Sequence, residues 1–400
     1  MTRKSTLGIN MIMKDEAENL PKSLAPLVSL ADEAVVVDTG SKDGSRSLAR
    51  SYGARVFDMP WRDDFSAARN QALASARTDY ILWLDADNYI SPEHFVKLKE
   101  ALPERGAPPV ILMATELVLP QGDKLWQKRV FPKASGVLFT GVIHEQLVHP
   151  EWMAVRLTDA EISHWGYADP KEARRKGERN LKLLLTAPGT LKGDFYHLYQ
   201  TGRTLLNLRR FAEAKNYLTR AAQSQTSNLS LWSHAVILLA SCHKALGDTL
   251  ASEKALKALV DMRPEYGPGR FYLGKSLYVQ GKARRAAKEL ALALDLGLGD
   301  PGWGSPDERM SFTCAQLLGK ILSEEGEEKK AAEAFKKALA FCPDNPEPRV
   351  ALAELALVAG NTQEAEGYIT KALMLAPYHR KAQHIARELS ADTHGIGASV

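Results

Sequence analysis

The chain has 400 residues, a length that exceeds one hydrophobic core and favours two domains. Its 52 Lys and Arg against 48 Asp and Glu leave a formal net charge of +4, too weakly basic to indicate nucleic-acid binding. No stretch reaches the roughly 18 uncharged apolar residues that a membrane helix requires. Without a signal-peptide pattern, and with three scattered cysteines, the sequence predicts a cytoplasmic protein with no integral membrane segment.

The first half of the chain alternates predicted strands and helices. Strands are predicted over 7–13, 34–38, 54–57 and 80–84, and helices over 17–30, 43–52 and 66–76 between them. Such alternation is typical of a parallel sheet covered by helices. A helix to about residue 102, strands over 110–119, 126–131 and 137–139, and a helix over 171–185 complete the predicted α/β domain.

The apolar run from Tyr80 to Leu84 ends in Asp85-Ala86-Asp87. A short continuous apolar run is typical of a strand buried on both faces, and ligands bind at the carboxyl ends of such strands. A turn directly after the strand lets both carboxylates approach one cation, and hard oxygen ligands suit Mg2+ or Mn2+, which would neutralise a diphosphate. The alternative is a pair of aspartates that shape the loop and cap the next helix.

A second polar turn follows the predicted strand that ends at Asp38. Gly40 and Gly44 permit backbone conformations that larger residues resist, and Ser41 or Asp43 can cap the next helix. Asp38 is free to accept hydrogen bonds from the base or ribose of a ligand. An ordinary turn between a strand and a helix would use the same residue types.

Four motifs occur in order: residues 10–20 (NMIMKDEAENL), 37–45 (VDTGSKDGS), 61–70 (WRDDFSAARN) and 84–87 (LDAD). Together they resemble family 2 glycosyltransferases, and within that family the branch that carries tetratricopeptide repeats and includes peptide S-glycosyltransferases. The resemblance implies a GT-A fold, which is a Rossmann-like α/β domain. It also implies a nucleotide-diphosphate sugar as donor, with a UDP-sugar expected.

The resemblance further implies roles for single residues in donor binding. Glu16 and Asp38 would line the nucleoside pocket. Arg69 would lie near the nucleotide, and Asn70 would support the loop beneath it. Many members of the family carry a second aspartate where this chain has Thr39, which makes the contact to the base less secure.

The metal ligands that the resemblance implies are Asp85 and Asp87, with Asp87 as the direct ligand and Asp85 also near the donor. His164 is a further candidate, because histidine is a competent metal ligand and GT-A enzymes sometimes supply one from a late strand. Beside Trp165 and Tyr167, the same histidine can instead be a packed or stacking residue.

The pair His144-Glu145 stands in an otherwise apolar and turn-forming stretch. Inverting sugar transfer requires a group that takes the acceptor's proton while the nucleophile attacks the anomeric carbon. Glu145 is the first candidate for this general base, and His144 is the second. In the alternative interpretation the pair only orders the acceptor loop, or Glu145 pairs with Arg129.

The predicted helix over 171–185 carries several basic residues. Its Lys176, Arg179 and Lys182 lie on one side of the helix by their three-residue spacing. That side faces either phosphate or water.

The second half of the chain repeats itself. Two of the three intervals between Gly247, Gly281, Gly326 and Gly360 equal 34 residues, which is the tetratricopeptide period. A divergent copy around Gly202 makes about five repeats. Such repeats stack into an α-solenoid, which binds extended peptide or protein chains or associates with itself, so a homo-oligomer is possible. The predicted domains are 1–190 (GT-A), 191–390 (repeats) and 391–400 (disordered tail).

These features together predict a metal-dependent, inverting glycosyltransferase that moves a single sugar to a peptide or protein acceptor. One rival interpretation is transfer to a lipid-linked or lipopolysaccharide glycan. Another is a scaffold without catalytic activity, in which the first domain senses a nucleotide-sugar. The intact Asp85-Ala86-Asp87 and Glu145 favour the enzyme over the scaffold.

Overall fold

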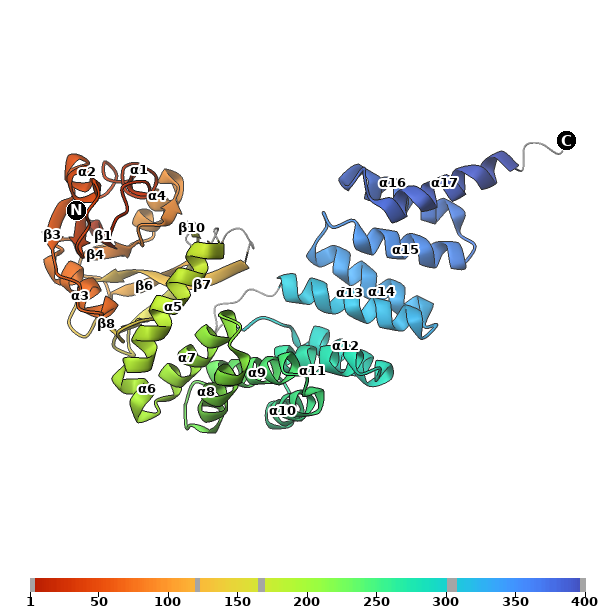
Figure 1. Ribbon diagram of the computed structural model, residues 1–400. Helices are drawn as coiled ribbons and strands as arrows, with labels where there is room; N and C mark the ends of the chain where they lie inside the picture. The colour runs from red at the N-terminus through yellow and green to blue at the C-terminus, as the bar shows by residue number, and fades with distance from the viewer. Residues whose placement is uncertain (1–3, 119–122, 165–169, 301–307, 396–400) are drawn as a thin grey trace. The chain divides into compact units, whose positions relative to one another are not determined.

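The computed structural model describes residues 4–118, 123–164, 170–300 and 308–395. The chain divides into two compact units, Met1–Ser227 with Pro301–Ser305, and Asn228–Asp300 with Pro306–Val400. Unit 1 therefore holds the α/β domain together with the first helices of the repeats (Figure 1). The domain boundary expected at residue 190 stays a prediction.

Unit 1 is built on an eight-stranded sheet with the strand order β3-β2-β1-β4-β7-β6-β10-β5. The strands are β1 (Leu7–Met13), β2 (Glu33–Asp38), β3 (Arg55–Asp58), β4 (Tyr80–Trp83), β5 (Asn88–Ile90), β6 (Val110–Val118), β7 (Asp123–Pro132) and β10 (Ala154–His164). Strands β1 to β4 pair in parallel, as predicted. A separate hairpin joins β8 (Leu138–Thr140) to β9 (Gln146–Val148).

The sheet is mixed, whereas the sequence pattern predicts a parallel one. Strand β7 is antiparallel to both β4 and β6, and β5 is antiparallel to β10. Only residues 119–122 join β6 to β7. A parallel pair needs a crossover of a dozen or more residues, so this short connection requires antiparallel pairing.

Four helices pack against strands of the sheet (Figure 1): α1 (Leu20–Ser23), α2 (Ser45–Ser51), α3 (Phe65–Ser75) and α4 (Pro92–Glu100). Two further helices, α5 (Pro170–Thr186) and α6 (Pro188–Lys192), pack against each other and against the helix that follows them. Strand β4 is buried on both sides, because Tyr80 and Leu82 belong to the core cluster of α4, and Ile81 and Trp83 to the cluster of α3. This two-sided burial explains the continuous apolar run that precedes Asp85.

The helix predicted over 17–30 is wrong, since only Leu20–Ser23 are helical. Pro26 lacks a backbone N–H and cannot continue a helix. Beyond α1 the chain forms tight turns, in which Leu27 N–H donates to the Leu24 carbonyl and Leu30 N–H to the Leu27 carbonyl.

The helical repeats begin with α7. The helices are α7 (Phe195–Asn207), α8 (Phe211–Gln223), α9 (Leu229–Ala245), α10 (Thr249–Met262), α11 (Gly267–Val279), α12 (Ala283–Leu296), α13 (Glu308–Glu324), α14 (Glu328–Phe341), α15 (Glu347–Val358), α16 (Thr362–Leu375) and α17 (Arg380–Gly395). Each odd-numbered helix from α7 to α15 contacts the helix that follows it. The predicted all-α repeat array is confirmed. Helix α17 continues into the segment predicted as a disordered tail, of which 396–400 lie outside the described residues.

The turn inside each repeat requires a left-handed backbone. Gly247, Gly281, Gly326 and Gly360 have φ values between 73° and 84°. The corresponding residue of the first repeat is Arg209, with φ 62°. Glycine adopts this conformation without a steric penalty, and arginine does not.

Small residues allow the two helices of a repeat to approach closely. A Cβ atom added to Gly202 would lie 2.5 Å from Leu218, and one added to Gly274 would lie 2.7 Å from Leu290. These glycines therefore keep the space that the leucine of the second helix fills.

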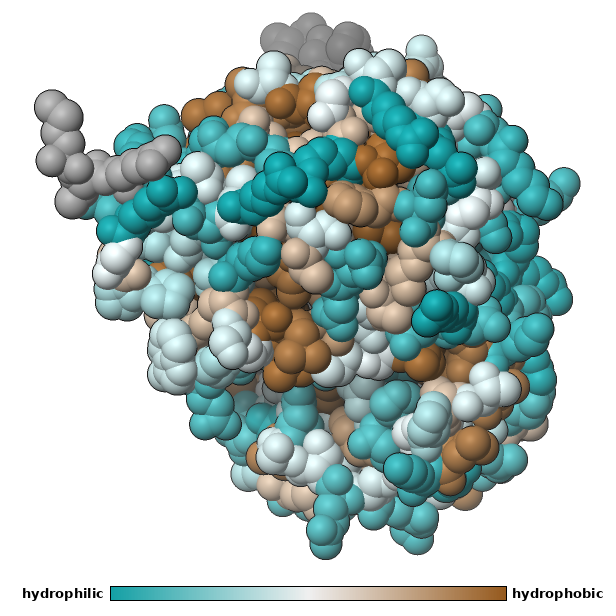
Figure 2. Space-filling model, turned by 90° about the vertical axis from the view of Figure 1, so that its left-hand side faces the viewer, coloured by the Kyte–Doolittle hydropathy of each residue, from teal (hydrophilic) through white to brown (hydrophobic). Residues whose placement is uncertain are grey.

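None of the helices in the described residues combines the length and apolar character needed to cross a bilayer. Figure 2 shows one face of the molecule, where hydrophilic side chains predominate and hydrophobic ones gather in small separate groups. That face has no broad apolar patch among the described residues drawn on it.

Candidate functional site

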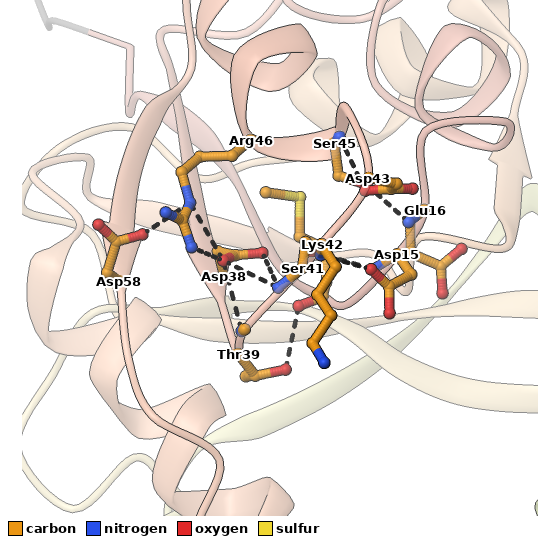
Figure 3. A network of polar contacts seen from close by, with 12 residues as sticks. Asp15, Glu16, Asp38, Thr39, Ser41, Lys42, Asp43, Ser45, Arg46 and Asp58 are labelled. Carbon is orange, nitrogen blue, oxygen red and sulfur yellow. Dashed lines mark hydrogen bonds and ion pairs between the residues drawn. The ribbon is translucent and has the colours of Figure 1, made fainter.

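Asp38, the last residue of β2, organises the loop that follows that strand (Figure 3). Its carboxylate accepts hydrogen bonds from the backbone N–H groups of Gly40 and Ser41, at 3.3 and 3.2 Å. Arg46 of α2 pairs with the same carboxylate at 2.6 Å and with Asp58 at 3.0 Å. Although burial opposes ionisation, the hydrogen bonds from Ser41 and Arg46 hold the pKa of Asp38 below its usual range. The acceptor oxygens of Asp38 thus bind groups of the protein itself.

The loops after β1 and β2 are joined to each other, and we call residues 15–17 with 41–45 the two-loop clasp. In each of four hydrogen bonds a backbone N–H of one loop donates to a side chain of the other. The donor and acceptor residues are Asp15 and Ser41 (2.9 Å), Lys42 and Asp15 (2.7 Å), Glu16 and Ser45 (2.7 Å), and Ala17 and Asp43 (3.1 Å). Figure 3 shows Asp15 and Glu16 beside Ser41, Lys42, Asp43 and Ser45 at the end of β2. The clasp fixes one loop against the other.

Thr39, where the chain departs from the family pattern, points inward. It is buried, and its hydroxyl donates to the Met13 carbonyl at 3.1 Å. The side chain therefore binds the end of β1.

The backbone of Glu16 belongs to the clasp, and its carboxylate has other partners. The carboxylate accepts a hydrogen bond from Asn19 at 2.6 Å. Burial raises the pKa of Glu16 against this hydrogen bond, and the charge of Asp87 adds to the rise while that of Lys176 opposes it. Glu16 therefore lies within electrostatic range of the residues after β4.

Asp85 lies between two arginines at the end of β4. Its Oδ1 accepts hydrogen bonds from Arg69 at 3.0 Å and from the Trp83 indole at 3.1 Å, and its Oδ2 accepts one from Arg129 at 3.3 Å. Burial favours the neutral acid, but Arg69 and Arg129 outweigh it and hold the pKa of Asp85 far below its usual range. Both oxygens of Asp85 thus bind cationic side chains.

Arg69 of α3 joins Asp85 to Glu145. Its guanidinium lies over the ring of Trp83 at 4.3 Å and over that of Phe139 at 5.1 Å. It forms ion pairs with both Asp85 and Glu145. The aromatic rings and the two carboxylates together fix the position of this cation.

Glu145 is buried, with 6% of its side chain exposed. Burial raises the pKa of its carboxyl, and the Arg69 charge opposes the rise without cancelling it. The structure thus pairs Glu145 with Arg69, whereas one interpretation of the sequence pairs it with Arg129. Arg129 instead binds Asp85 and, at 2.7 Å, Glu116.

The loop before Glu145 is held against α3. The Ser66 hydroxyl donates to the Gly141 carbonyl at 2.8 Å, and Phe65 N–H donates to the Val142 carbonyl at 2.9 Å. The Asn70 side chain exchanges two hydrogen bonds with the backbone of Phe139, each at 2.8 Å. Asn70 therefore fastens the strand that leads into this loop.

His144 has a left-handed backbone, with φ 51°, and its carbonyl accepts a hydrogen bond from the Tyr196 hydroxyl at 2.9 Å. Its Nε2 is buried and has no hydrogen-bond partner among the described residues. Burial, together with the charges of Arg203 and Arg179, lowers the pKa of His144 to about 4. The imidazole is therefore neutral at neutral pH.

Asp87 faces a different set of side chains from Asp85. Lys176 of α5 donates to Asp87 Oδ2 at 2.9 Å, and His164 Nδ1 lies 3.5 Å from Asp87 Oδ1. His164 Nδ1 also contacts the Asn88 amide nitrogen at 2.8 Å and lies 3.8 Å from Glu116. Because the amide nitrogen can only donate, Nδ1 is the acceptor, and the imidazole proton lies on Nε2.

The charged side chains after β4 form a continuous series, with the uncharged His164 between Asp87 and Glu116, and we call this series the ion-pair chain. Its members in spatial order are Lys176, Asp87, His164, Glu116, Arg129, Asp85, Arg69 and Glu145. The structure thus brings together all the predicted site residues from Arg69 onward except His144 and Asn70, which hold the neighbouring loop.

In the described residues, no group of three or more His, Cys, Asp or Glu side chains is arranged to hold a metal ion. Asp87 nevertheless offers an oxygen donor of the kind that Mg2+ and Mn2+ prefer, and the imidazole nitrogen of His164 lies 3.5 Å from it. The four carboxylates of the ion-pair chain and Glu16 exceed its three Lys and Arg by two negative charges, with His164 counted as uncharged. A divalent cation at Asp87 would offset that excess.

Glu116 and Asn88 were not predicted as site residues. The signal for Glu116 is a carboxylate within the otherwise apolar run of β6. Such a residue is seldom buried without a partner, and its partners are Arg129 and His164. Asn88 accepts the Asp85 backbone N–H at 3.0 Å and so shapes the turn between the two aspartates.

Comparisons with known proteins support the two-part organisation. The model of glycosyl transferase family 2 matches residues 9–113, and a tetratricopeptide repeat model matches residues 322–386. Among solved structures, YrrB, a TPR protein with an unusual peptide-binding site, is 17% identical with a TM-score of 0.39, over 49% of this chain and 93% of that one. A TM-score of that size carries no argument about function.

Three curated proteins are similar to parts of the chain. A TPR repeat-containing protein of Synechococcus elongatus is 32% identical over 53% of this chain and 55% of its own length. The SPbeta prophage-derived glycosyltransferase SunS of Bacillus subtilis is 25% identical over 54% and 53%. An uncharacterized glycosyltransferase of Rickettsia bellii is 34% identical over 23% and 31%. The chain spans about half the length of the first two relatives and about a third of the last. The first half of the chain is thus similar to glycosyltransferases of family 2, and its C-terminal part to tetratricopeptide repeats.

Proposed function

We propose that the chain is a metal-dependent, inverting glycosyltransferase that transfers one sugar from a nucleotide-diphosphate sugar, a UDP-sugar, to a peptide or protein acceptor. The observation that carries the proposal is the position of Arg69, whose guanidinium contacts both the strand-end Asp85 and the buried Glu145. Asp85, which directly follows the strand, and the buried Glu145 thus belong to one connected set of contacts, to which we also assign the cation at Asp87. Sugar transfer requires the cation and the buried carboxylate within reach of one donor.

The donor side of the site would use Asp87, His164 and the two-loop clasp. Asp87 and His164 would hold Mg2+ or Mn2+, and Asp85 would keep Arg69 and Arg129 beside them. The ion would supply positive charge to the departing diphosphate. In this proposal Glu16 lies at the border between the clasp and the cation site, where a nucleoside joins its diphosphate.

Glu145 would be the general base. It would take the proton of the acceptor nucleophile as that atom attacks the anomeric carbon, and the bond to the diphosphate breaks on the opposite face, which inverts the configuration. Burial raises the pKa of Glu145, and a base whose pKa lies closer to the working pH transfers protons more effectively. With a pKa of about 4, His144 would be a weak base, because a low proton affinity opposes proton uptake.

The acceptor class follows from the repeats. Stacked helical repeats present extended surfaces that bind unfolded chain segments. Their presence beside a glycosyltransferase domain favours a peptide or protein over a glycolipid. The similarity to SunS is compatible with this acceptor, and a cytoplasmic location and self-association remain part of the proposal.

Donor turnover tests the catalytic assignment. We expect Glu145→Gln to lower kcat by about 10²- to 10⁴-fold with Mn2+ and a panel of labelled nucleotide-sugars, while nucleotide binding persists. Glu151→Gln, at an exposed carboxylate a few residues away, is the matched control and keeps full activity. Full activity of Glu145→Gln would overturn the assignment of the base.

The pH profile gives an independent readout of Glu145. The base must be ionised, and its pKa is raised, so activity falls as pH decreases through a value above the 4.5 of an ordinary glutamate. We expect this acidic limb in kcat/KM of the unsubstituted protein. A limb at or below 4.5 would contradict the role of Glu145.

Incubation of labelled donor with cell lysate tests the acceptor. We expect the label in the protein fraction, with Mn2+ present and Asp87→Ala as the inactive control. Label in the glycolipid fraction alone would replace the peptide acceptor by a lipid-linked glycan.

A further inference from the structure

Helix α5 brings an ammonium group to the aspartate that the proposed function assigns to the divalent cation. Lys176 Nζ lies 2.9 Å from Asp87 Oδ2. Only 21% of the Lys176 side chain and 17% of the Asp87 side chain are exposed. The pair is therefore a partly buried contact, in which charge is screened less than at the surface.

A divalent cation on Asp87 would compete with the Lys176 ammonium for the charge of one carboxylate. Lys176 contacts Oδ2, and a cation held by Asp87 and His164 would lie beside Oδ1, where His164 Nδ1 is 3.5 Å away. Two positive charges on one carboxylate lie only a few ångströms apart, and their repulsion is strong where water is scarce. Binding of a metal ion would therefore weaken the ion pair of Lys176 with Asp87.

Once Lys176 leaves Asp87, its ammonium group can pair with the diphosphate of the donor. The lysine stem is a flexible four-carbon chain with a compact charge, which makes lysine a common ligand of phosphate groups. A diphosphate bound to the cation at Asp87 would lie within reach of the Lys176 side chain. The same lysine would then pair with Asp87 in the absence of donor and with the donor in its presence.

We propose that Lys176 is an exchangeable counterion of the donor site, which competes with the divalent cation for Asp87 and contacts the diphosphate once it is displaced. The inference rests on the proposed function, because that function assigns the cation to Asp87. It makes cation binding and diphosphate binding cooperative: the cation alone must displace the lysine, whereas with diphosphate present the lysine gains a new partner.

The test uses the full-length protein with Lys176→Met, which keeps most of the side-chain stem and removes the charge. Lys182→Met, at an exposed position of the same helix, is the matched control. Binding of Mn2+ alone is measured from the electron paramagnetic resonance signal of free Mn2+. We expect Lys176→Met to bind Mn2+ about fivefold more tightly than the unsubstituted protein, as the loss of one competing ion pair implies.

The second measurement is the affinity for UDP at saturating Mn2+, with GDP, ADP and CDP in parallel. We expect Lys176→Met to weaken binding of the nucleoside diphosphate that binds best by about tenfold, because a charge-assisted contact is lost. Lys176→Arg, which keeps the charge, should recover most of this loss. Lys182→Met should change neither affinity.

The proposal requires both changes, so an unchanged Mn2+ affinity or an unchanged diphosphate affinity in Lys176→Met overturns it. Thermal unfolding of each variant establishes that the fold is intact, and Lys176→Arg gives a folded comparison. If Lys176→Met shows both changes and no nucleotide-sugar is turned over, the counterion role stands and the transferase assignment fails. If Asp87→Ala leaves Mn2+ binding unaltered, the cation is not at Asp87. The counterion role of Lys176 and the metal-dependent transferase assignment then fail together.

Discussion

The ion-pair chain of unit 1 and the helical repeats use their side chains in different ways. In the ion-pair chain each member contacts partners from distant segments, as Arg129 of β7 contacts Asp85 after β4 and Glu116 of β6. In the repeats a glycine faces residues of one neighbouring helix, as Gly274 of α11 faces Leu290 and the Ala286 carbonyl of α12. A substitution in the ion-pair chain should therefore affect partners from several segments, whereas one in a repeat should act within one pair of helices.

The largest test of this difference is Arg129→Met. It leaves Glu116 without its closest cation and Asp85 with one arginine fewer. Removing one partner of a buried ion pair typically costs about 3–5 kcal/mol, so we expect a loss of that order in the free energy of unfolding measured with urea. Arg129→Lys, which keeps the charge, should lose less. A loss below about 1 kcal/mol for Arg129→Met would remove the distinction between the two regions.

The second test is the pH dependence that His144 adds to unit 1. In the unfolded chain its imidazole takes up a proton near pH 6.5, but in the folded chain only near pH 4. Proton uptake by His144 therefore favours the unfolded chain between these two pH values. The stability that the neutral imidazole contributes to the folded chain is complete above pH 6.5 and is lost as pH falls to about 4. It amounts to on the order of 3 kcal/mol. His144→Asn, which tolerates the left-handed backbone, should lose less stability between these pH values, and equal losses in both proteins would contradict the effect.

Two glycines of the repeats test whether a substitution there acts only through its immediate neighbours. Gly274→Ala places a Cβ 2.7 Å from Leu290, and we expect overpacking to cost about 1–3 kcal/mol in the free energy of unfolding. Gly367 in α16 has no atom within 4 Å of an added Cβ. Gly367→Ala should therefore stabilise the protein by up to about 1 kcal/mol through helix propensity. Thermal unfolding checks both, and the same sign for both variants would argue against a local effect.

The smallest effect is expected at the turn of the first repeat. Arg209 has a left-handed backbone where the other aligned positions have glycine. Arg209→Gly should raise the free energy of unfolding by about 1 kcal/mol, because the steric penalty disappears. Gly281→Ala is the reverse control and should lower it by a similar amount. An unchanged stability in Arg209→Gly would mean that other contacts determine the conformation of this turn.

The sequence predicted the repeats better than it predicted the site, and the reason is the range of the contacts. Helix pairs in the repeats depend on residues a fixed distance apart, so the positions of Gly247 and Gly281 are readable from spacing alone. Strands β1, β2 and β4 were readable because their apolar runs are continuous. Strand β10 was missed because the first half of this strand is exposed and mixes apolar with polar residues. The helix predicted over 17–30 is shorter in the structure, because Pro26 lacks the backbone N–H that a continuing helix requires.

At the site, the sequence indicated which side chains are charged and which loops carry them. It did not indicate the pairing: the sequence suggested Arg129 as a partner of Glu145, whereas the structure pairs Glu145 with Arg69. Glu116 was hidden for the same reason, since it faces Arg129 only through the pairing of β6 with β7. Pairing across a sheet is a three-dimensional property, and a one-residue shift would turn these side chains to the opposite face.

The two-loop clasp has a consequence for engineering the nucleotide preference that the proposed function assigns to it. Because each loop donates hydrogen bonds to side chains of the other, the two segments behave as one rigid insert. Suppose that residues 15–17 alone, or 41–45 alone, were replaced by those of a relative with another nucleotide preference. Backbone N–H groups of one loop would then lose their side-chain acceptors in the other. Only a transplant of both segments together would carry a new preference into this scaffold intact.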